Sequence, residues 1–376
     1  MGMDAIPIDL LELILLFIAS PVFLVRAAST CKQWRRIIAK ADFLRRFRCL
    51  HRPPVAGYYY DSKRFSPSSP PVINGHYFSL DFLPGSNDYI NPGVWRFMDS
   101  RGSLLLFDYY SDKDEVRHMF ICEPVTKRSK KIQAVSAPYP LYYNTAFLLD
   151  GNNVQPDGIS MSNFRVLCLL HYGNRMHAKV FTLGDSWRET SIESQSMNFI
   201  GLALGSMYWY AGHRKVVTFD QSSAKFSSFT LPDIENWDSH VNQHRLAVTA
   251  SRDGMVRVVV GVAGGDMKVF ARLPGGSCEW VLKKRIPLFT AISSLPWREA
   301  WYFQQLPISS HRTGAVLIIT TRMSLLPRQT TPLMFRLDIE TMAVERMPDP
   351  NMGIPYPCEL PWPPIFHVTD HDDHAT

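Results

Sequence analysis

The sequence lacks the short motifs that mark most enzyme and metal sites. It has no glycine-rich phosphate loop, no Gly-x-Ser-x-Gly elbow and no His-Glu-x-x-His pair. Its six cysteines are scattered, and no two stand in a Cys-x-x-Cys relation, which argues against a zinc site or a redox pair. No Asn-x-Ser/Thr sequon occurs, so the chain fits a reducing intracellular compartment. We therefore assign no catalytic residue, no metal and no cofactor.

A long hydrophobic run is also missing. The most apolar stretch, Leu13 to Val25, is broken by Pro21 and is too short for a membrane span. A secretory signal needs basic residues before its apolar run, and here only acids precede it, namely Asp4, Asp9 and Glu12. We expect no membrane partner, and a membrane-tethered or secreted β-protein is the weakest of the alternatives.

Basic charge is concentrated at one end of the chain. The first 52 residues hold nine Lys and Arg against four acids, so they carry a net +5 of the chain's +6. This concentration points to an acidic partner for the N-terminal segment. It argues against a protein that coats nucleic acid, because the rest of the chain is nearly neutral.

The N-terminal segment shows four successive helix patterns. Leu10, Leu11, Ile14, Leu15 and Ile18 form one wide apolar face, with Pro7 near the helix start. Ser20 and Pro21 are typical of an N-cap and a first helical residue. The inward positions predicted for the three later helices are Leu24, Val25 and Ala28, then Cys31, Trp34, Ile37 and Ile38, and then Phe43, Leu44 and Phe47 after an Asp42 N-cap. A unit of about forty residues cannot bury all of this apolar surface in its own core. We therefore expect either the following domain or another protein to cover the remaining apolar side chains.

These residues resemble an F-box over positions 4 to about 44. Ile6-Pro7 stands in place of the Leu-Pro of the family, Pro21 opens the second helix, and Cys31-x-x-Trp34 is followed by a basic pair. The sequence departs from the pattern at Ile8, where an acid is usual, and at Phe23, where many members are polar. The resemblance implies binding to an acidic Skp-family adaptor and, through it, to a cullin scaffold. The adaptor-binding residues that it implies, as contacts or as their supports, are Ile6, Pro7, Leu10, Leu11, Ile14, Leu15 and Trp34; Leu11 and Ile14 fit an internal position equally well.

The remainder of the chain is rich in short strand patterns. Five units repeat a turn, an apolar strand, a turn and a second strand, at intervals of roughly forty to sixty residues, which is near the blade period of a β-propeller. The units are 102–128, 164–189, 199–232, 244–273 and 314–348. The region also resembles the F-box-associated region of plant F-box proteins, especially those of grasses, through Trp95–Tyr110 and Pro124-x-Thr126-x-Arg128. A β-sandwich or barrel is the alternative, and the five units do not fix a blade number.

The expected fold class is therefore multidomain α+β, a small helical F-box followed by an all-β domain that is most simply a β-propeller. The predicted division is a helical domain at 1–50, a Pro- and Ser-rich linker at 51–72, a substrate-recognition domain at 73–366 and a disordered polar tail at 367–376.

Three further features carry weaker signals. The tail places His367 and His371 at a metal-ligand spacing, but a frayed terminus is the simpler interpretation. The basic run from Thr126 to Lys131 fits a nuclear import patch less well than a hairpin turn. Four tryptophans fit either a recognition face or core packing: Trp187, Trp209, Trp280 and Trp297.

The favoured function is the substrate receptor of a cullin-RING ubiquitin ligase, which is not itself an enzyme and whose protein substrate the sequence does not reveal. The alternatives are a propeller-class enzyme, which would need convergent polar side chains at the propeller axis, and a protein-interaction scaffold outside the ligase system. The expected location is the cytoplasm or the nucleus.

Overall fold

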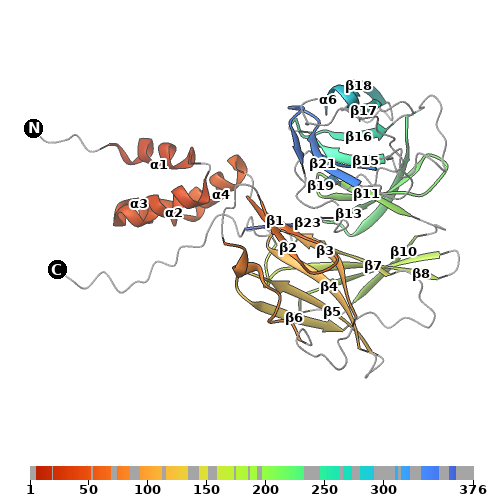
Figure 1. The fold of residues 1–376 in the computed structure, drawn as a ribbon, viewed down its shortest axis with the longest axis horizontal. Coiled ribbons are helices and arrows are strands. Elements are labelled where there is room, and N and C mark those ends of the chain that lie inside the picture. Colours follow the sequence, from red (N-terminus) through yellow and green to blue (C-terminus); the bar gives the residue numbers. More distant parts are fainter. Residues whose placement is uncertain are drawn as a thin grey trace, which may run out of the picture.

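The structure is a computed structural model in which a helical unit stands beside a ring of β-sheets (Figure 1). It describes residues 6–18, 20–51, 54–68, 74–84, 94–111, 116–133, 144–150, 159–172, 175–184, 187–192, 197–232, 246–251, 253–261, 266–272, 280–291, 310–311, 315–321, 332–346 and 355–360. None of the helices in these ranges is long and apolar enough to cross a bilayer.

The helical unit consists of α1 (Ile8–Leu16), α2 (Pro21–Thr30), α3 (Lys32–Ile38) and α4 (Ala41–Leu50). Ser20 is the N-cap residue of α2, as the sequence predicts, although its side chain forms no capping hydrogen bond. Pro7, expected near the start of α1, is the N-cap residue of that helix. The prediction of Asp42 as the N-cap of α4 is wrong, because Lys40 holds that position. Asp42 lies instead in the first turn, where its charge suits the positive helix end and pairs with Arg45 at 2.9 Å.

The apolar positions of the four helices meet in one small core. Its fully buried members are Leu11, Leu15, Leu16, Leu24, Ala27, Ala28, Ile37, Ile38, Phe43 and Phe47, with Ile18, Trp34 and Leu44 packed at its edge. The core is tied across the unit by a 2.6 Å ion pair between Glu12 of α1 and Arg46 of α4. Most of these are inward positions that the helical periodicity predicts, but the prediction is wrong for Val25 and Cys31, which are exposed.

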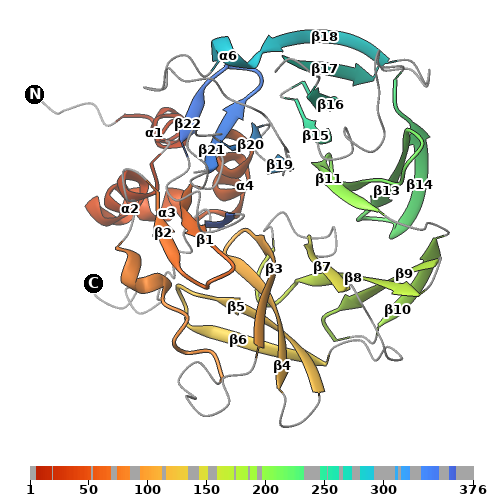
Figure 2. The same cartoon turned by 45° about the vertical axis from the view of Figure 1, so that its right-hand side comes forward.

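Within the described residues, the β-region contains five antiparallel units of four consecutive strands. Their strands are β3 (Val94–Arg101), β4 (Leu104–Ser111), β5 (Val116–Glu123) and β6 (Arg128–Gln133); β7 (Asn144–Leu149), β8 (Arg165–Tyr172), β9 (Arg175–Thr182) and β10 (Arg188–Ile192); β11 (Asn198–Ala203), β12 (Ser206–Tyr210), β13 (Lys215–Asp220) and β14 (Lys225–Thr230); β15 (Leu246–Ala250), β16 (Val256–Gly261), β17 (Asp266–Arg272) and β18 (Trp280–Pro287), followed by the short helix α6 (Leu288–Ala291); and β19 (Ser310–His311), β20 (Ala315–Thr321), β21 (Pro332–Asp338) and β22 (Val344–Arg346). Three of the units are separate sheets, and the third and fourth are joined into one eight-stranded sheet by a parallel contact between their first strands. Figure 2 shows the five units arranged around a common centre, with their first strands innermost.

A sixth, three-stranded unit closes the ring from both ends of the chain. It has the strand order β2 (Phe65–Pro67), β1 (Val55–Tyr59), β23 (Tyr356–Glu359), so strands almost three hundred residues apart pair side by side. The short 3-10 helix η1 (Gly75–Phe78) covers its outer side, where Phe78 accepts a hydrogen bond from the Tyr59 hydroxyl at 2.5 Å. In the described residues the ring therefore has six blades, and the expected helical domain followed by a β-propeller is confirmed.

The closing blade corrects the prediction of a linker at 51–72. Although this segment is rich in Pro and Ser, it contains the strands β1 and β2, which form the outer part of this blade. Gly57 lies at a β-bulge in β1 opposite β23. A Cβ atom at this position would lie 2.3 Å from the Ser66 carbonyl oxygen, which explains why glycine occupies it. The buried aromatics Tyr58 and Tyr59, which composition alone places in a loose segment, are core residues of the ring.

Candidate functional site

The first candidate site is an exposed apolar surface on the helical unit. Its residues, which we call the α1 apolar face, are Leu10, Leu13, Ile14 and Phe17; Ile6 and Ile8 are also exposed, before and at the start of the helix. Leu10 is 51% exposed, Ile14 is 47% exposed and Phe17 is 81% exposed. Two exposed residues of α2, Phe23 and Val25, add to the apolar surface of the unit. Apolar exposure on this scale over about three helical turns is typical of a surface that another protein covers.

The structure divides the seven residues that the F-box resemblance nominates into two groups. Ile6, Pro7, Leu10 and Ile14 are exposed. Leu11 and Leu15 are core residues of the helical unit, at 4% and 0% exposure, so their side chains are not part of its surface. Trp34 is half-buried at the edge of the same core. Of the two residues that fit an internal position equally well in the sequence, Leu11 is therefore internal and Ile14 lies on the surface.

The two departures from the F-box pattern both lie on the exposed surface. Ile8 is exposed in the first turn of α1, and Phe23 is exposed at the start of α2. Arg26 lies 5.8 Å above the Phe23 ring. Both departures therefore enlarge the exposed apolar area, while the basic side chains Lys32, Arg35, Arg36 and Lys40 remain on the surface of the same unit.

The second candidate site is a polar network that joins three successive blades near their inner strands. We call it the blade clasp, and it consists of Asp99, Arg101, Asp150, Arg165 and Gln221. Arg101 of β3 donates to the Leu148 carbonyl at 2.8 Å, to the Gln221 side chain at 2.6 Å and to the Asp150 carboxylate.

The other members complete the same network. Arg165 of β8 donates to the Asp150 carbonyl at 2.8 Å and to the Gln221 carbonyl at 2.9 Å. Asp99 accepts a 2.8 Å hydrogen bond from the Leu148 backbone N–H. Burial, the main cause, raises the pKa of Asp99 to about 7, although Arg101 acts in the opposite direction. These bonds make the clasp a structural link between blades, and the carboxylates near the axis are engaged in it.

The Pro-x-Thr-x-Arg pattern has a clear structural basis in the turn between β5 and β6. The buried Glu123 carboxylate accepts hydrogen bonds from Ser103 at 2.8 Å, Thr126 at 2.6 Å and Arg128 at 2.8 Å. Burial acts to raise the pKa of Glu123, but these hydrogen bonds outweigh it and lower the pKa below its ordinary value. The basic run thus begins in a hairpin turn and continues along exposed β6, as the simpler interpretation predicts.

The buried cysteines have no reactive environment. Burial raises the pKa of the thiols of Cys122, Cys168 and Cys358 well above the ordinary value. They are therefore protonated at neutral pH and pack as small apolar groups. Within the described ranges, no three His, Cys, Asp or Glu side chains gather in a way that fits a metal ion. The tail with His367 and His371 lies outside the described residues, as does Trp297.

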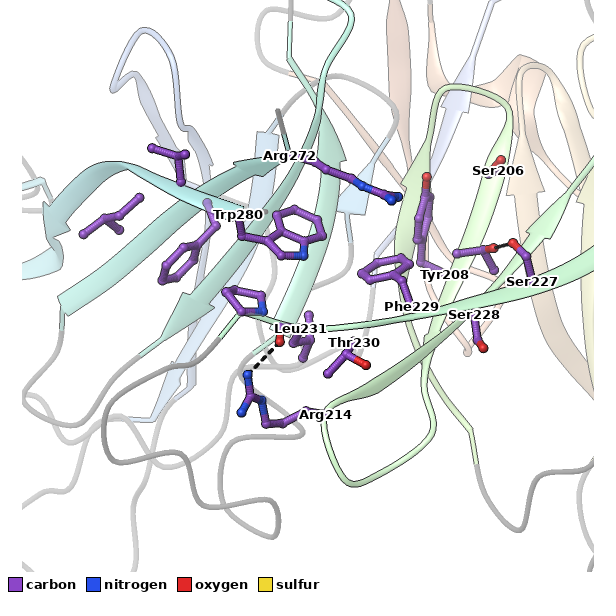
Figure 3. Close-up of a pocket in the computed structure, with 15 residues that line it drawn as sticks. Ser206, Tyr208, Arg214, Ser227, Ser228, Phe229, Thr230, Leu231, Arg272 and Trp280 are labelled. Atoms are coloured by element: carbon purple, nitrogen blue, oxygen red, sulfur yellow. Dashed lines mark hydrogen bonds between the residues drawn. The ribbon is translucent and has the colours of Figure 1, made fainter. Parts of the chain in front are cut away.

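A pocket of about 930 Å³ lies between the β11–β14 and β15–β18 blades (Figure 3). Its apolar part continues the core between these blades and includes Tyr208, Phe229, Phe270 and Trp280. The Phe229 and Trp280 rings face each other with centroids 5.5 Å apart. The remaining wall carries hydroxyl groups and two arginines: Ser206, Thr218, Ser227, Ser228, Thr230, Arg214 and Arg272.

Sequence patterns point to this pocket only through Trp280. Of the other tryptophans, Trp209 is 1% exposed and belongs to a core cluster, and Trp187 packs at the edge of another. Trp280 alone of the three described lines the pocket. The other lining residues belong to different strands, so only the pairing of the blades brings them together.

No protein-family model matches the chain, and no curated protein matches it. Several solved structures, β-propellers among them, resemble it at low sequence identity. The lectin of Aleuria aurantia in complex with alpha-methyl-L-fucoside is 13% identical with a TM-score of 0.37, over 72% of this chain and 79% of the lectin. AofleA from Arthrobotrys oligospora is 11% identical with a TM-score of 0.38, over 74% of this chain and 77% of that chain. The β-propeller domain of the Trilobed protease from Pyrococcus furiosus is 10% identical with a TM-score of 0.37, over 68% of this chain and 70% of that chain. The blade assignment of the present chain rests on its own strand pairing.

Proposed function

We propose that the protein is the substrate-recognition subunit of a cullin-RING ubiquitin ligase of the SCF type. In this proposal the helical unit is an F-box that binds a Skp-family adaptor, and the β-propeller holds the protein to be modified. The observation that carries the proposal is the α1 apolar face, which leaves Leu10, Ile14 and Phe17 exposed on a unit with its own complete core.

The physical case for an adaptor follows from surface and charge. A helical unit that buries Leu11 and Leu15 while exposing Leu10 and Ile14 has two apolar faces on one helix, and only one is used internally. Burying each large side chain of the exposed face in an interface contributes roughly 1.5–3 kcal/mol. The basic excess of the first 52 residues supports an acidic partner, which is the character of Skp-family adaptors.

The proposed role needs no catalytic group in this chain. A receptor accelerates transfer by holding the lysines of its target near the transferring enzyme, so its contribution is proximity. The arrangement in Figures 1 and 2 suits this role, since the helical unit projects from one side of the ring and the blades that form the pocket lie on the opposite side. An adaptor and a substrate would then occupy separate surfaces. The expected location is the cytoplasm or the nucleus, where cullin ligases act.

The experiment that tests the proposal uses purified components. The full chain is mixed with a purified Skp-family adaptor, and a truncated chain that begins at residue 51 is the comparison. We expect a stable complex with the full chain only. Addition of the cullin, its RING partner and the ubiquitin-transferring enzymes is then expected to modify lysines of the full chain itself. If the full chain forms no complex with any Skp-family adaptor tested, the proposal fails.

A further inference from the structure

The chain leaves its last described strand beside the helical unit. Leu360, which directly follows β23, donates its backbone N–H to the Pro54 carbonyl at 3.0 Å. Pro54 in turn stands four residues after the end of α4 at Leu50. Figures 1 and 2 both show β23 and β1 on the side of the ring that faces the helices. The residues that follow Leu360 therefore begin at the junction between the ring and the helical unit.

The C-terminal end of α1 lies at the same junction. The Nε2 atom of His51, just after α4, is 2.5 Å from the Leu16 carbonyl oxygen. Three peptide bonds separate His51 from Pro54, so these two residues lie within about 11 Å of each other. Phe17 follows Leu16 as the C-cap residue of α1 and is 81% exposed, and Leu50 is exposed at the end of α4. Exposed apolar side chains of both helices therefore lie near the point where the chain leaves β23.

The residues after Leu360 complement this surface in sequence. We call residues 361–376, which lie outside the described ranges, the C-terminal segment. Its first six residues include three large apolar ones, Trp362, Ile365 and Phe366. Its remaining residues contain three Asp and no Lys or Arg, so the segment carries a net −3 with His neutral. The first 52 residues of the chain carry a net +5, and opposite charges favour association. The C-terminal segment thus offers apolar groups to the α1 apolar face and negative charge to a basic unit.

The C-terminal segment is also long enough to cover the α1 apolar face. Its sixteen residues span up to about 50 Å when extended. The face runs from Leu10 to Phe17, which is about 10 Å along the helix axis. A segment tethered beside its binding surface acts at an effective concentration in the millimolar range. Contacts of modest intrinsic affinity are therefore enough to keep the segment bound.

From these observations we propose that the C-terminal segment docks on the α1 apolar face of its own chain. Trp362 and Phe366 pack on the exposed apolar side chains, and the Asp residues lie beside the basic side chains of the helical unit. An adaptor that binds the same face must displace the segment, so docking lowers the affinity for the adaptor. Docking itself stands on the apolar face and on the sequence of the segment. Its role as an inhibitor of adaptor binding rests on the proposed function.

Photo-cross-linking in the full chain tests the docking directly. Phe366 is replaced by p-benzoylphenylalanine, the purified protein is irradiated, and mass spectrometry of the digest identifies the linked residues. We expect links within one chain to residues 8–17. The double variant L10D/I14D in the same background is expected to reduce their yield by about tenfold or more. L204D, at an exposed leucine of the ring, is the control and should keep the yield unchanged.

Isotope mixing separates docking in one chain from contact between two chains. The cross-linking is repeated on an equimolar mixture of unlabelled and heavy-isotope-labelled protein, in which a link between two copies gives mixed-isotope pairs. Links mainly between copies would show that a second chain covers the face, and would overturn the proposal. Absence of links to α1 would overturn it as well. So would an unchanged yield in L10D/I14D that circular dichroism shows to be folded.

Adaptor affinity tests the inhibitory role and separates it from the proposed function. W362S/F366S is expected to bind the adaptor about fivefold or more tightly than wild type, because the fraction of chains with an uncovered face rises. T369A, in the same segment, is the control and should bind as wild type does. Equal affinity of W362S/F366S and wild type would refute the inhibitory role. Links to α1 without any adaptor complex would keep the docking and remove the ligase role, whereas an adaptor complex without such links would do the reverse.

Discussion

Arg101 and Gln221 are 120 residues apart in the sequence, yet their side chains form a 2.6 Å hydrogen bond that joins the first described four-stranded blade to the third. The Gln221 side-chain oxygen also accepts a hydrogen bond from the Asp150 backbone N–H at 3.2 Å. A single side-chain amide of the third blade is thus hydrogen-bonded to the first and the second blade. The propeller is thus held by specific polar contacts near its inner strands as well as by apolar packing between blades.

The blade clasp predicts a stability effect at Gln221. In Q221A, the Arg101 guanidinium and the Asp150 N–H lose their shared acceptor in a buried site. We expect the free energy of unfolding to fall by about 1–3 kcal/mol. Urea unfolding followed by tryptophan fluorescence measures it, with the exposed substitution K225A on β14 as the control. An effect of Q221A no larger than that of K225A would show that the clasp is energetically neutral.

The Glu123 turn predicts an effect that depends on acidity. T126V removes the hydroxyl that donates to the buried Glu123 carboxylate, and we expect a loss of about 1–3 kcal/mol at neutral pH. Because the folded-state pKa of Glu123 is lowered, this stabilisation is present above the ordinary pKa and is lost as pH falls through the folded value. The difference between wild type and T126V should therefore shrink in acid, while the exposed control K130A should show no difference at any pH. A difference that stays constant down to pH about 2 would contradict this role of Glu123.

The carboxylates near the axis predict the opposite pH dependence. Burial raises the pKa of Asp99 and of Glu359 to about 7, so the folded state holds protons that the unfolded state has released between pH about 4 and about 7. Their contribution to stability is complete below the unfolded pKa and declines as pH rises toward 7.

The variant D99N tests this because asparagine keeps an acceptor for the Leu148 N–H and does not ionise. We expect D99N to flatten the decline in unfolding free energy between pH about 5 and about 7.5, measured by denaturant titrations across that range. D266N, at an exposed position of β17, serves as the control. An unchanged slope in D99N would mean that Asp99 is ionised throughout.

Local patterns predict the helices and most of the hairpins because their residues are close in sequence. The helical periodicity places Leu15, Ile38 and Phe47 inward, and the core of the helical unit contains all three. Each of the five predicted strand units likewise falls within a different described blade, because most of its strands follow one another closely in the sequence.

The features that escape prediction depend on distant pairing. β1 pairs with β23 through Tyr59 and Tyr356, and no local pattern in the Pro- and Ser-rich segment indicates that partner. The pocket is missed for the same reason, since Phe229 and Trp280 come from different blades. On α1, apolar periodicity does not separate Leu11, which is buried, from Leu10, which is exposed.

Binding of a Skp-family adaptor by the α1 apolar face is the step on which the proposed function depends. The most direct measurement is the affinity of purified adaptor for wild type, for the double variant L10D/I14D and for L204D, an exposed leucine of the propeller. Because Leu10 and Ile14 are exposed, the double variant is expected to keep its fold, which circular dichroism checks. We expect L10D/I14D to weaken the complex by more than about a hundredfold, equivalent to roughly 2.8 kcal/mol, and L204D to bind as wild type does. Equal affinity of the folded double variant and wild type would contradict adaptor binding by this face.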